Sequence, residues 1–131
     1  MSLDYHQTPQ HHYELAKELA PLRRKGILII GSGNLVHNLR MVAWDRLNDE
    51  FGYDWALEAS DKMKKFILSG DHKQLINFRS HGKPFELAIP TPEHYLPLLY
   101  AMALKDEKDA ISLFNDKAIA GSLTMTSVRI G

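Results

Sequence analysis

Two histidines in this sequence are placed where an imidazole could act as an acid, a base or a metal ligand. The first, His37, follows an uninterrupted aliphatic run at residues 27–30 and a Gly-Ser-Gly sequence at residues 31–33. Such a short apolar run predicts a strand buried on both faces, and the glycines predict a turn with backbone angles that other residues avoid. Ligands of open α/β sheets collect beyond the carboxyl ends of the strands, so this pattern indicates a site at His37.

The second histidine, His94, lies among prolines at positions 90, 92 and 97, just before an apolar stretch that predicts a helix. Each proline fixes its own φ angle, so the backbone around His94 has little freedom. We expect His94 at the amino-terminal end of that helix and close to His37, although the two are 57 positions apart (94 − 37). Imidazoles that share a metal have ring nitrogens within roughly 3–4 Å of each other.

Both histidines also have a purely structural interpretation. A histidine after a buried strand is often a hydrogen-bonded core residue, and Glu93 and His94 suit the solvated first turn of a helix. The sequence has no Gly-x-Ser-x-Gly nucleophile motif, no Walker loop and no Gly-x-Gly-x-x-Gly fingerprint. The residue pattern alone therefore leaves a functional and a structural role open.

Composition excludes several classes of function. The chain has 131 residues, enough for one domain with a core, and its 16 basic and 16 acidic residues cancel. This balance argues against a nucleic-acid partner or an anionic membrane surface. The absence of cysteine excludes disulfides, thiolate catalysis and zinc–thiolate sites, and it agrees with a cytoplasmic location. No apolar run has the length of a transmembrane helix, and no signal peptide is visible.

Helical and strand patterns alternate along the chain. Helices are predicted after Thr8-Pro9, over about 54–68, over about 71–78 and from Leu98, and strands at 111–114 and 122–130, with Ser2–Tyr5 as the end of a further strand. This alternation predicts an α/β fold with a mostly parallel sheet centred on residues 27–30 and helices on its faces. His11 and His12 are adjacent in the first helix, so they cannot face the same way, and both are expected at the surface.

Several of these stretches, taken together, resemble a known family. The sequences SLDY, GILIIGSGNLVHNLR, GYDWA, TPEHYLPLLYA and SLTMTSVRIG occur in this order along nearly the whole chain. They resemble the carboxyl-terminal half of class III extradiol ring-cleaving dioxygenases, in the DOPA 4,5-dioxygenase-like branch. The resemblance implies that residues 1–131 are the carboxyl-terminal half of such a catalytic domain, and therefore an incomplete part of a larger single-domain fold.

The resemblance also implies a cofactor, substrates and site residues. Enzymes of this class cleave a catechol with O₂ at a mononuclear Fe(II), and Zn(II) can occupy such sites. By residue match His94 is a metal ligand, and His37 is either a further ligand or the acid–base residue that exchanges protons with the catechol. Ser32 and Asn34 are the substrate-binding residues that this match implies.

One departure from the family is large, because its two amino-terminal histidine motifs have no counterpart here. The resemblance thus implies a partner: a missing amino-terminal half, or a second chain in a homodimer that covers exposed strand edges. The alternative is a non-catalytic, truncated remnant that folds, self-associates and binds metal weakly at most. A zinc hydrolase is a weaker third hypothesis, with Glu93 as its only candidate base.

Overall fold

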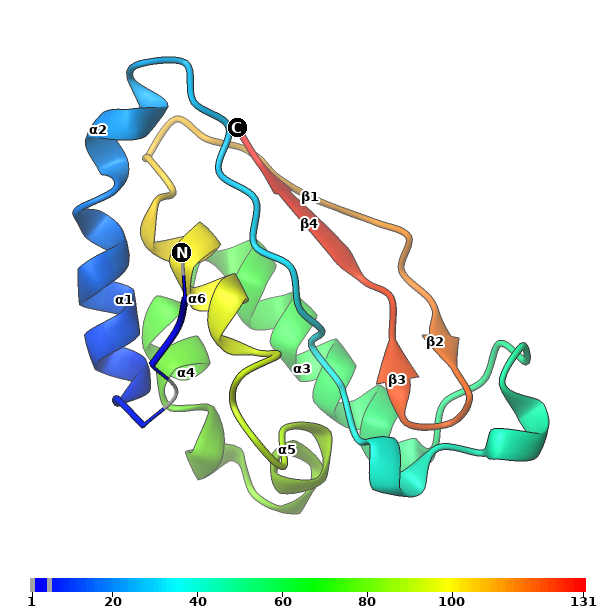
Figure 1. Cartoon of the computed structure of the whole chain (residues 1–131). Coiled ribbons are helices and arrows are strands. Elements are labelled where there is room, and N and C mark those ends of the chain that lie inside the picture. The colour runs from blue at the N-terminus through cyan, green and yellow to red at the C-terminus, as the bar shows by residue number, and fades with distance from the viewer. Residues whose placement is uncertain (1, 5) are drawn as a thin grey trace.

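A computed structural model describes residues 2–4 and 6–131. It is a mixed α/β structure, in which helices form one layer and the closing part of the chain lies across them (Figure 1). The helical elements are α1 (Pro9–Lys17), α2 (Ala20–Arg23), η1 (Leu39–Met41), η2 (Trp44–Arg46), α3 (Asp54–Ser69), α4 (His72–Ile76), η3 (Phe78–His81), α5 (Lys83–Ala88) and α6 (Leu96–Ala103). The strands are β1 (Ile111–Phe114), β2 (Ala118–Ile119), β3 (Leu123–Thr124) and β4 (Ser127–Ile130).

Local capping residues account for several helix boundaries. The Thr8 side chain accepts a hydrogen bond from the amide of His11, and Pro9 occupies the first position of α1, as predicted. The Asp71 side chain caps α4 in the same way, through the amide of Gln74. Helix α3 ends at Gly70, whose φ of 66° places it in the left-handed region that glycine tolerates best. The predicted 54–68 helix is therefore confirmed to within one residue.

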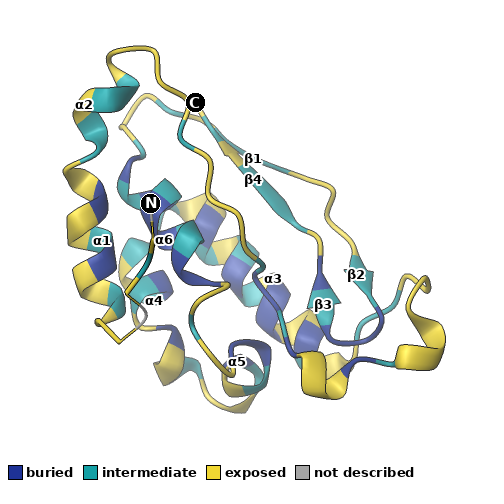
Figure 2. Ribbon diagram, viewed as in Figure 1, coloured by how far each residue is buried: buried dark blue, intermediate teal, exposed yellow. Residues whose placement is uncertain are grey.

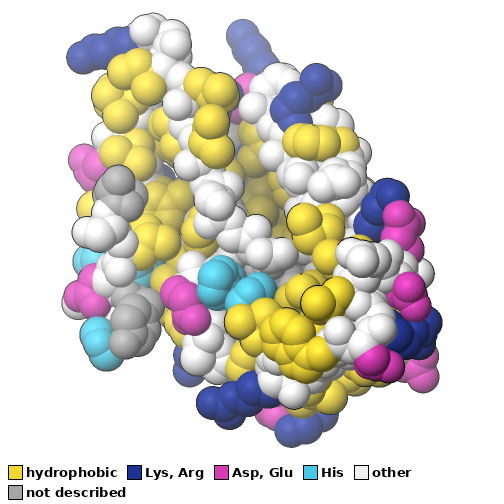
Figure 3. Space-filling view, turned by 45° about the vertical axis from the view of Figure 1, so that its right-hand side comes forward, with side chains coloured by type: hydrophobic (Ala, Val, Ile, Leu, Met, Phe, Trp, Pro, Cys, Tyr) yellow, Lys and Arg dark blue, Asp and Glu magenta, His cyan; other side chains and the backbone are white. Residues whose placement is uncertain are grey.

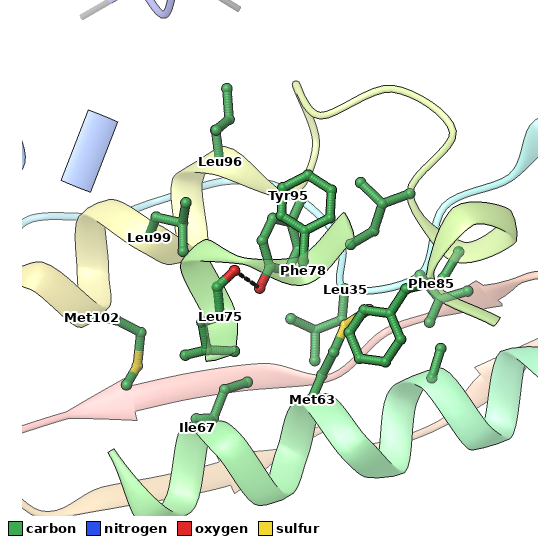
Figure 4. Close-up of a cluster of buried hydrophobic side chains, with 14 of the residues drawn as sticks. Leu35, Met63, Ile67, Leu75, Phe78, Phe85, Tyr95, Leu96, Leu99 and Met102 are labelled. Carbon is green, nitrogen blue, oxygen red and sulfur yellow. Dashed lines mark hydrogen bonds between the residues drawn. The ribbon is translucent and has the colours of Figure 1, made fainter. Parts of the chain in front are cut away.

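The hydrophobic core lies where α3, α5 and α6 meet, and Figure 4 shows its larger side chains. On α3, Ala59, Met63 and Ile67 are fully buried, whereas Trp55 and Phe66 are partly buried and pack against the core. The core also holds a hydrogen bond, because the Tyr95 hydroxyl donates to the Leu75 carbonyl at 2.9 Å. This bond satisfies a polar group that would otherwise be costly to bury.

The parallel sheet that the sequence predicted is not found in the described part of the chain. Both sheets are two-stranded and antiparallel: β1 pairs with β4, and β2 pairs with β3. The prediction of a strand at 111–114 is confirmed, and the predicted 122–130 strand is divided into β3 and β4. These strands follow one another closely along the chain, so short connections favour antiparallel pairing over a crossover.

Residues 27–30, predicted as the central strand, pair with no other strand among the described residues. This segment runs unpaired from the end of α2, between α6 and β4, and is largely exposed (Figures 1 and 2). Leu28 and Ile30 are 80% and 79% exposed, so the expectation of burial on both faces was wrong. An apolar run becomes a buried strand only where other strands flank it, and none does so among the described residues.

Two further expectations change. His12 was expected at the surface but is buried, with one ring nitrogen 3.0 Å from the Tyr100 hydroxyl and the other 3.0 Å from the Asp4 carbonyl. Helix α1 packs against α6, which turns the His12 side of α1 inward and leaves His11 exposed.

In the predicted strand Ser2–Tyr5, residues 2–4 form no strand, and Tyr5 lies outside the described residues. Nowhere in residues 2–4 and 6–131 is a helix long and apolar enough to span a membrane.

Candidate functional site

The glycines before His37 allow two distant segments to touch. A Cβ atom at Gly33 would lie 2.1 Å from the His94 carbonyl oxygen, and one at Gly31 would lie 2.8 Å from the Pro97 carbonyl oxygen. Neither glycine has a positive φ, so the predicted special backbone angles are not what these positions require. The absence of a side chain is what matters, because it lets the backbone approach the turn before α6.

Hydrogen bonds then fix this approach. The amide of Asn34 donates to the His94 carbonyl at 2.8 Å, which joins the two histidine-bearing segments directly. The amide of His37 donates to the Ala88 carbonyl at 2.9 Å, and His37 also forms an isolated antiparallel bridge with Leu123. The segment around His37 is therefore held on one side by α5 and on the other by the β3 region.

Buried polar groups add a second set of bonds on the same segment. The Thr124 hydroxyl accepts from the amide of Val36, and the Ser122 hydroxyl donates to the Asn38 carbonyl at 2.8 Å. The Asn38 side-chain amide reaches the Leu87 carbonyl at 2.8 Å. All three polar side chains are buried, so these bonds satisfy groups that would be costly to leave unpaired.

The imidazoles of His37 and His94 lie face to face. Their ring centroids are 3.8 Å apart and their planes are inclined by 26°. His37 is half-buried and His94 is exposed. The prediction that these two histidines approach each other is confirmed. Their proximity depends on the contacts of Gly33 and Asn34 described above.

The surroundings favour a neutral His37. Burial lowers the pKa of its imidazole below the ordinary value, the neighbouring His94 lowers this pKa further, and the Glu93 carboxylate opposes both effects. Glu93 itself accepts a hydrogen bond from the Thr91 hydroxyl at 2.7 Å, and this bond is the main cause of the lowered pKa of its carboxyl group. The pair of imidazoles thus has an ionised carboxylate beside it.

The two residues assigned to substrate binding have different environments. Asn34 is half-buried, and its side-chain NH₂ group donates to the Thr124 carbonyl at 2.7 Å. This hydrogen bond joins the segment before His37 to β3. Ser32 is exposed and lies between Gly31 and Gly33. Substrate binding by either residue stays a prediction.

The imidazole nitrogens of His37 and His94 are suitable ligands for Fe(II) or Zn(II), but two ligands are too few for a complete site. Neutral imidazole is a good ligand for both metals. Within residues 2–4 and 6–131, however, no group of three or more metal-ligating side chains is found. The two rings also face each other, so their in-plane nitrogens do not converge on one point. Joint binding requires one ring to turn, and the exposed His94 has room to do so.

An apolar surface and a groove adjoin the histidines. Figure 3 shows histidine side chains beside an acidic side chain on one flank and a broad apolar surface on the other. Exposed apolar residues follow His37 along the chain, among them Leu39 at 52% and Trp44 at 65% exposure. A groove of about 690 Å³ lies between residues 27–31, α6 and β4, and it is lined by His94 but not by His37.

The residues of the closing strands that position this site were not predicted from the sequence. Thr124 and Ser122 hold the segment around His37, but both lie in an ordinary alternating strand pattern. Gly33 was recognised as unusual for a different reason, its conformational freedom. Only the contact with His94 explains why a glycine stands there.

Comparison with solved structures supports the fold. A crystal structure of an uncharacterized protein from Escherichia coli K12 superimposes with a TM-score of 0.84 and 38% sequence identity, over 99% of this chain and 53% of that one. No protein-family model matches the sequence.

Curated relatives carry one common description, "4,5-DOPA dioxygenase extradiol". The Escherichia coli K12 protein is 39% identical over 100% of this chain and 48% of its own length. The Beta vulgaris protein is 28% identical over 98% of this chain and 47% of its own. The Portulaca grandiflora protein is 32% identical over 79% of this chain and 37% of its own.

These similarities make the chain a homologue, over its whole length, of part of the 4,5-DOPA dioxygenase extradiol proteins. The chain spans about half the length of the curated relatives it matches.

Proposed function

We propose that this chain supplies part of the active site of an extradiol dioxygenase that opens a catechol ring with O₂. The observation that carries this proposal is the face-to-face contact of His37 and His94 at 3.8 Å between segments 57 positions apart (94 − 37). The description shared by the relatives gives the reaction class. The remaining metal ligands come from outside the described residues, either from the rest of a longer protein or from another chain.

In this proposal His94 holds Fe(II), or Zn(II) in its place, and His37 is either a further ligand or the acid–base residue. The metal, when bound, supplies a Lewis acid that polarises the catechol oxygens and a position for O₂ beside the ring. The polypeptide supplies the rest: His94 presents a nitrogen from the rigid turn before α6, and Gly33 and Asn34 keep that turn against the His37 segment.

His37 also has the properties of a base. Its pKa lies below the ordinary value, so the ring is neutral near pH 7 and its free nitrogen can accept the proton of a catechol hydroxyl. The same ring can later return that proton as the carbon–carbon bond next to the diol breaks and both oxygen atoms of O₂ enter the product. The apolar surface formed by Leu39 and Trp44 is suited to cover an aromatic ring.

The test is ring-opening activity, followed by the yellow colour of the semialdehyde product. The 131-residue chain alone, supplied with Fe(II) anaerobically before O₂ is admitted, is expected to show little turnover, because two ligands do not fix the facial geometry. Fusion to the half of the Escherichia coli relative that it does not match is expected to restore ring opening. In that fusion, His94→Ala should abolish metal binding and activity together.

The exposed residue His11 offers a matched control for that experiment. His11→Ala in the fusion should leave metal content and turnover unchanged, because His11 lies on the outer side of α1. Loss of activity without loss of metal in His37→Ala would assign the acid–base role, and loss of both would make His37 a ligand. Rapid turnover by the short chain alone would contradict the proposal that its site is incomplete.

A second candidate function is a non-catalytic remnant that folds, self-associates and binds metal weakly. One observation favours it: the described residues contain no group of three metal-ligating side chains. The fusion experiment separates the two, since a remnant whose site has been lost would stay inactive when the other half is supplied.

A further inference from the structure

The turn between β2 and β3 is buried and has a strained backbone. Ala120 has a φ of 51° and Gly121 a φ of 81°. The left-handed region is unfavourable for alanine, because its Cβ atom approaches the following carbonyl oxygen. Within residues 2–4 and 6–131, the only other non-glycine residue with a positive φ is Asn115, and asparagine tolerates this conformation well. A strained residue persists only where the surrounding structure fixes it.

Burial of this turn is unusual in itself. Connections between strands ordinarily lie at the surface, where water can satisfy their backbone groups. Ala120 and Ser122 are nevertheless fully buried, and Figure 2 shows the turn in the colour of buried residues. Its amides and carbonyls must therefore find partners within the protein.

Those partners come from one segment, residues 38–53. Each backbone amide and carbonyl of Ala120 and Gly121 is bonded to it. The bonds run from the Ala120 amide to the Asp49 carbonyl (3.1 Å), from the Ala43 amide to the Ala120 carbonyl (3.0 Å), from the Gly121 amide to the Phe51 carbonyl (3.1 Å) and from the Tyr53 amide to the Gly121 carbonyl (2.8 Å).

The next two residues of the chain continue this attachment up to His37. The amide of Asn38 donates to the Ser122 carbonyl at 3.2 Å, and the Ser122 hydroxyl donates to the Asn38 carbonyl at 2.8 Å. Leu123 then forms the isolated bridge with His37. Consecutive residues of the turn and of β3 thus hold the chain from His37 to Tyr53.

Gly121 is also in close contact with this segment. A Cβ atom at Gly121 would lie 2.4 Å from Cε2 of the Tyr53 ring, and Gly121 forms an isolated parallel bridge with Gly52. Any side chain at this position would push the end of the segment away from the turn. The glycine is therefore required by its neighbour as well as by its φ angle.

We propose that the turn at residues 120–122 is a positioning element of the candidate site. The segment that it fixes begins next to His37 and carries the apolar surface of Leu39 and Trp44, so the turn sets where both lie. The inference rests on the proposed function for the role of that surface, which is to cover the catechol ring. The residues of the turn act through residues 38–53 and are positioning residues.

NMR spectroscopy of the 131-residue chain tests the positioning without any need for activity. In the unmodified chain, the stacked rings of His37 and His94 should give a nuclear Overhauser cross-peak. Gly121→Ala should weaken or abolish this cross-peak and shift the indole signal of Trp44, because the segment must leave the turn.

Gly70→Ala is the matched control for that variant. Gly70 also has a positive φ, 66°, but a Cβ atom there would meet no atom closer than 4.0 Å. It imposes the same backbone strain at the end of α3, so it should leave the ring cross-peak and the Trp44 signal unchanged. Circular dichroism verifies that each variant is folded.

Ser122→Ala is a milder second variant, and it decides the question if Gly121→Ala does not fold. It removes only the hydroxyl that bonds the Asn38 carbonyl, and it should weaken the cross-peak between the two imidazoles. Tyr100→Phe is its control, because it removes another hydroxyl hydrogen bond, the one to His12, and should leave the cross-peak intact. Unchanged signals of His37 and Trp44 in the folded turn variants, or equal changes in the controls, would overturn the proposal.

The fusion with the unmatched half of the Escherichia coli relative tests the consequence for catalysis. Gly121→Ala in the fusion should raise KM for the catechol by roughly tenfold or more and keep the metal content, because the His94 turn is held separately by Asn34. An unchanged KM in an active fusion would contradict the role of the turn. Inactivity of the unmodified fusion would instead refute the proposed function, and the NMR result would still decide whether the turn positions His37.

Discussion

The backbone amide of Asn34 donates a 2.8 Å hydrogen bond to the carbonyl of His94, and this contact decides where both histidines lie. It is made possible by Gly33, where any side chain would collide with the same carbonyl. The His37 segment and the turn before α6 are thereby joined, although each is built from its own local sequence. The candidate site is a consequence of this one close approach.

Replacing Gly33 by Ala should therefore separate the two histidine segments. The added methyl group would lie 2.1 Å from the His94 carbonyl oxygen, so the backbone must move and the Asn34–His94 bond must lengthen or break. We expect the free energy of unfolding to fall by roughly 1–3 kcal/mol, as for other overpacked sites. Urea denaturation measures the change, and Ser32→Ala at the exposed neighbouring position is the control. Equal stabilities for the two variants would refute this explanation of the glycine.

A second prediction concerns the buried His12. Both of its ring nitrogens have partners, the Tyr100 hydroxyl and the Asp4 carbonyl, and the side chain links α1 to α6. His12→Leu should lower the free energy of unfolding by about 1–3 kcal/mol, because it leaves the Tyr100 hydroxyl without its partner. His11→Leu, on the exposed side of the same helix, should change it little.

The pairing of His12 with Tyr100 can be isolated by a double-mutant cycle. If the hydroxyl and the imidazole interact as described, Tyr100→Phe should cost much less in the His12→Leu background than in the unmodified chain. Additive effects of the two substitutions would contradict a direct hydrogen bond between them.

The lowered pKa of His37 has a consequence for stability. The folded state binds a proton at His37 less readily than the unfolded chain, whose pKa is about 6.5. The stabilising contribution is therefore complete above pH 6.5 and is lost as the pH falls through that value toward the lower pKa of the folded state. Urea denaturation at several pH values should show a weaker loss of stability on acidification for His37→Asn than for the unmodified chain. A His37 that titrates above its ordinary value in an NMR pH series would contradict the burial described here.

How far the sequence predicted the fold depends on which partners each element needs. The helix at residues 54–69 follows from its own periodicity and from Gly70, and these signals are local. The run at residues 27–30 has an equally clear pattern, but a strand requires neighbours, and no strand pairs with this run among the described residues. His12 shows the same limit, since its burial is decided by Tyr100, 88 positions away.

The candidate site was predictable in part for the same reason. His37 and His94 were recognised from their flanking glycines and prolines, which are local signals, and their proximity followed. The residues that fix them, Thr124 and Asn38 among them, act through hydrogen bonds to distant segments that no local pattern reveals.

The most direct test of the central claim is an NMR titration of the 131-residue chain with Zn(II), following the ring signals of its seven histidines. If His37 and His94 belong to one metal site, their signals should shift together, with one dissociation constant and one metal per chain. Binding should be weak, because only two ligands come from the described residues. His94→Ala should abolish the zinc-dependent shift of His37. Shifts of His37 and His94 with different dissociation constants, or a zinc response confined to other histidines, would contradict a shared site.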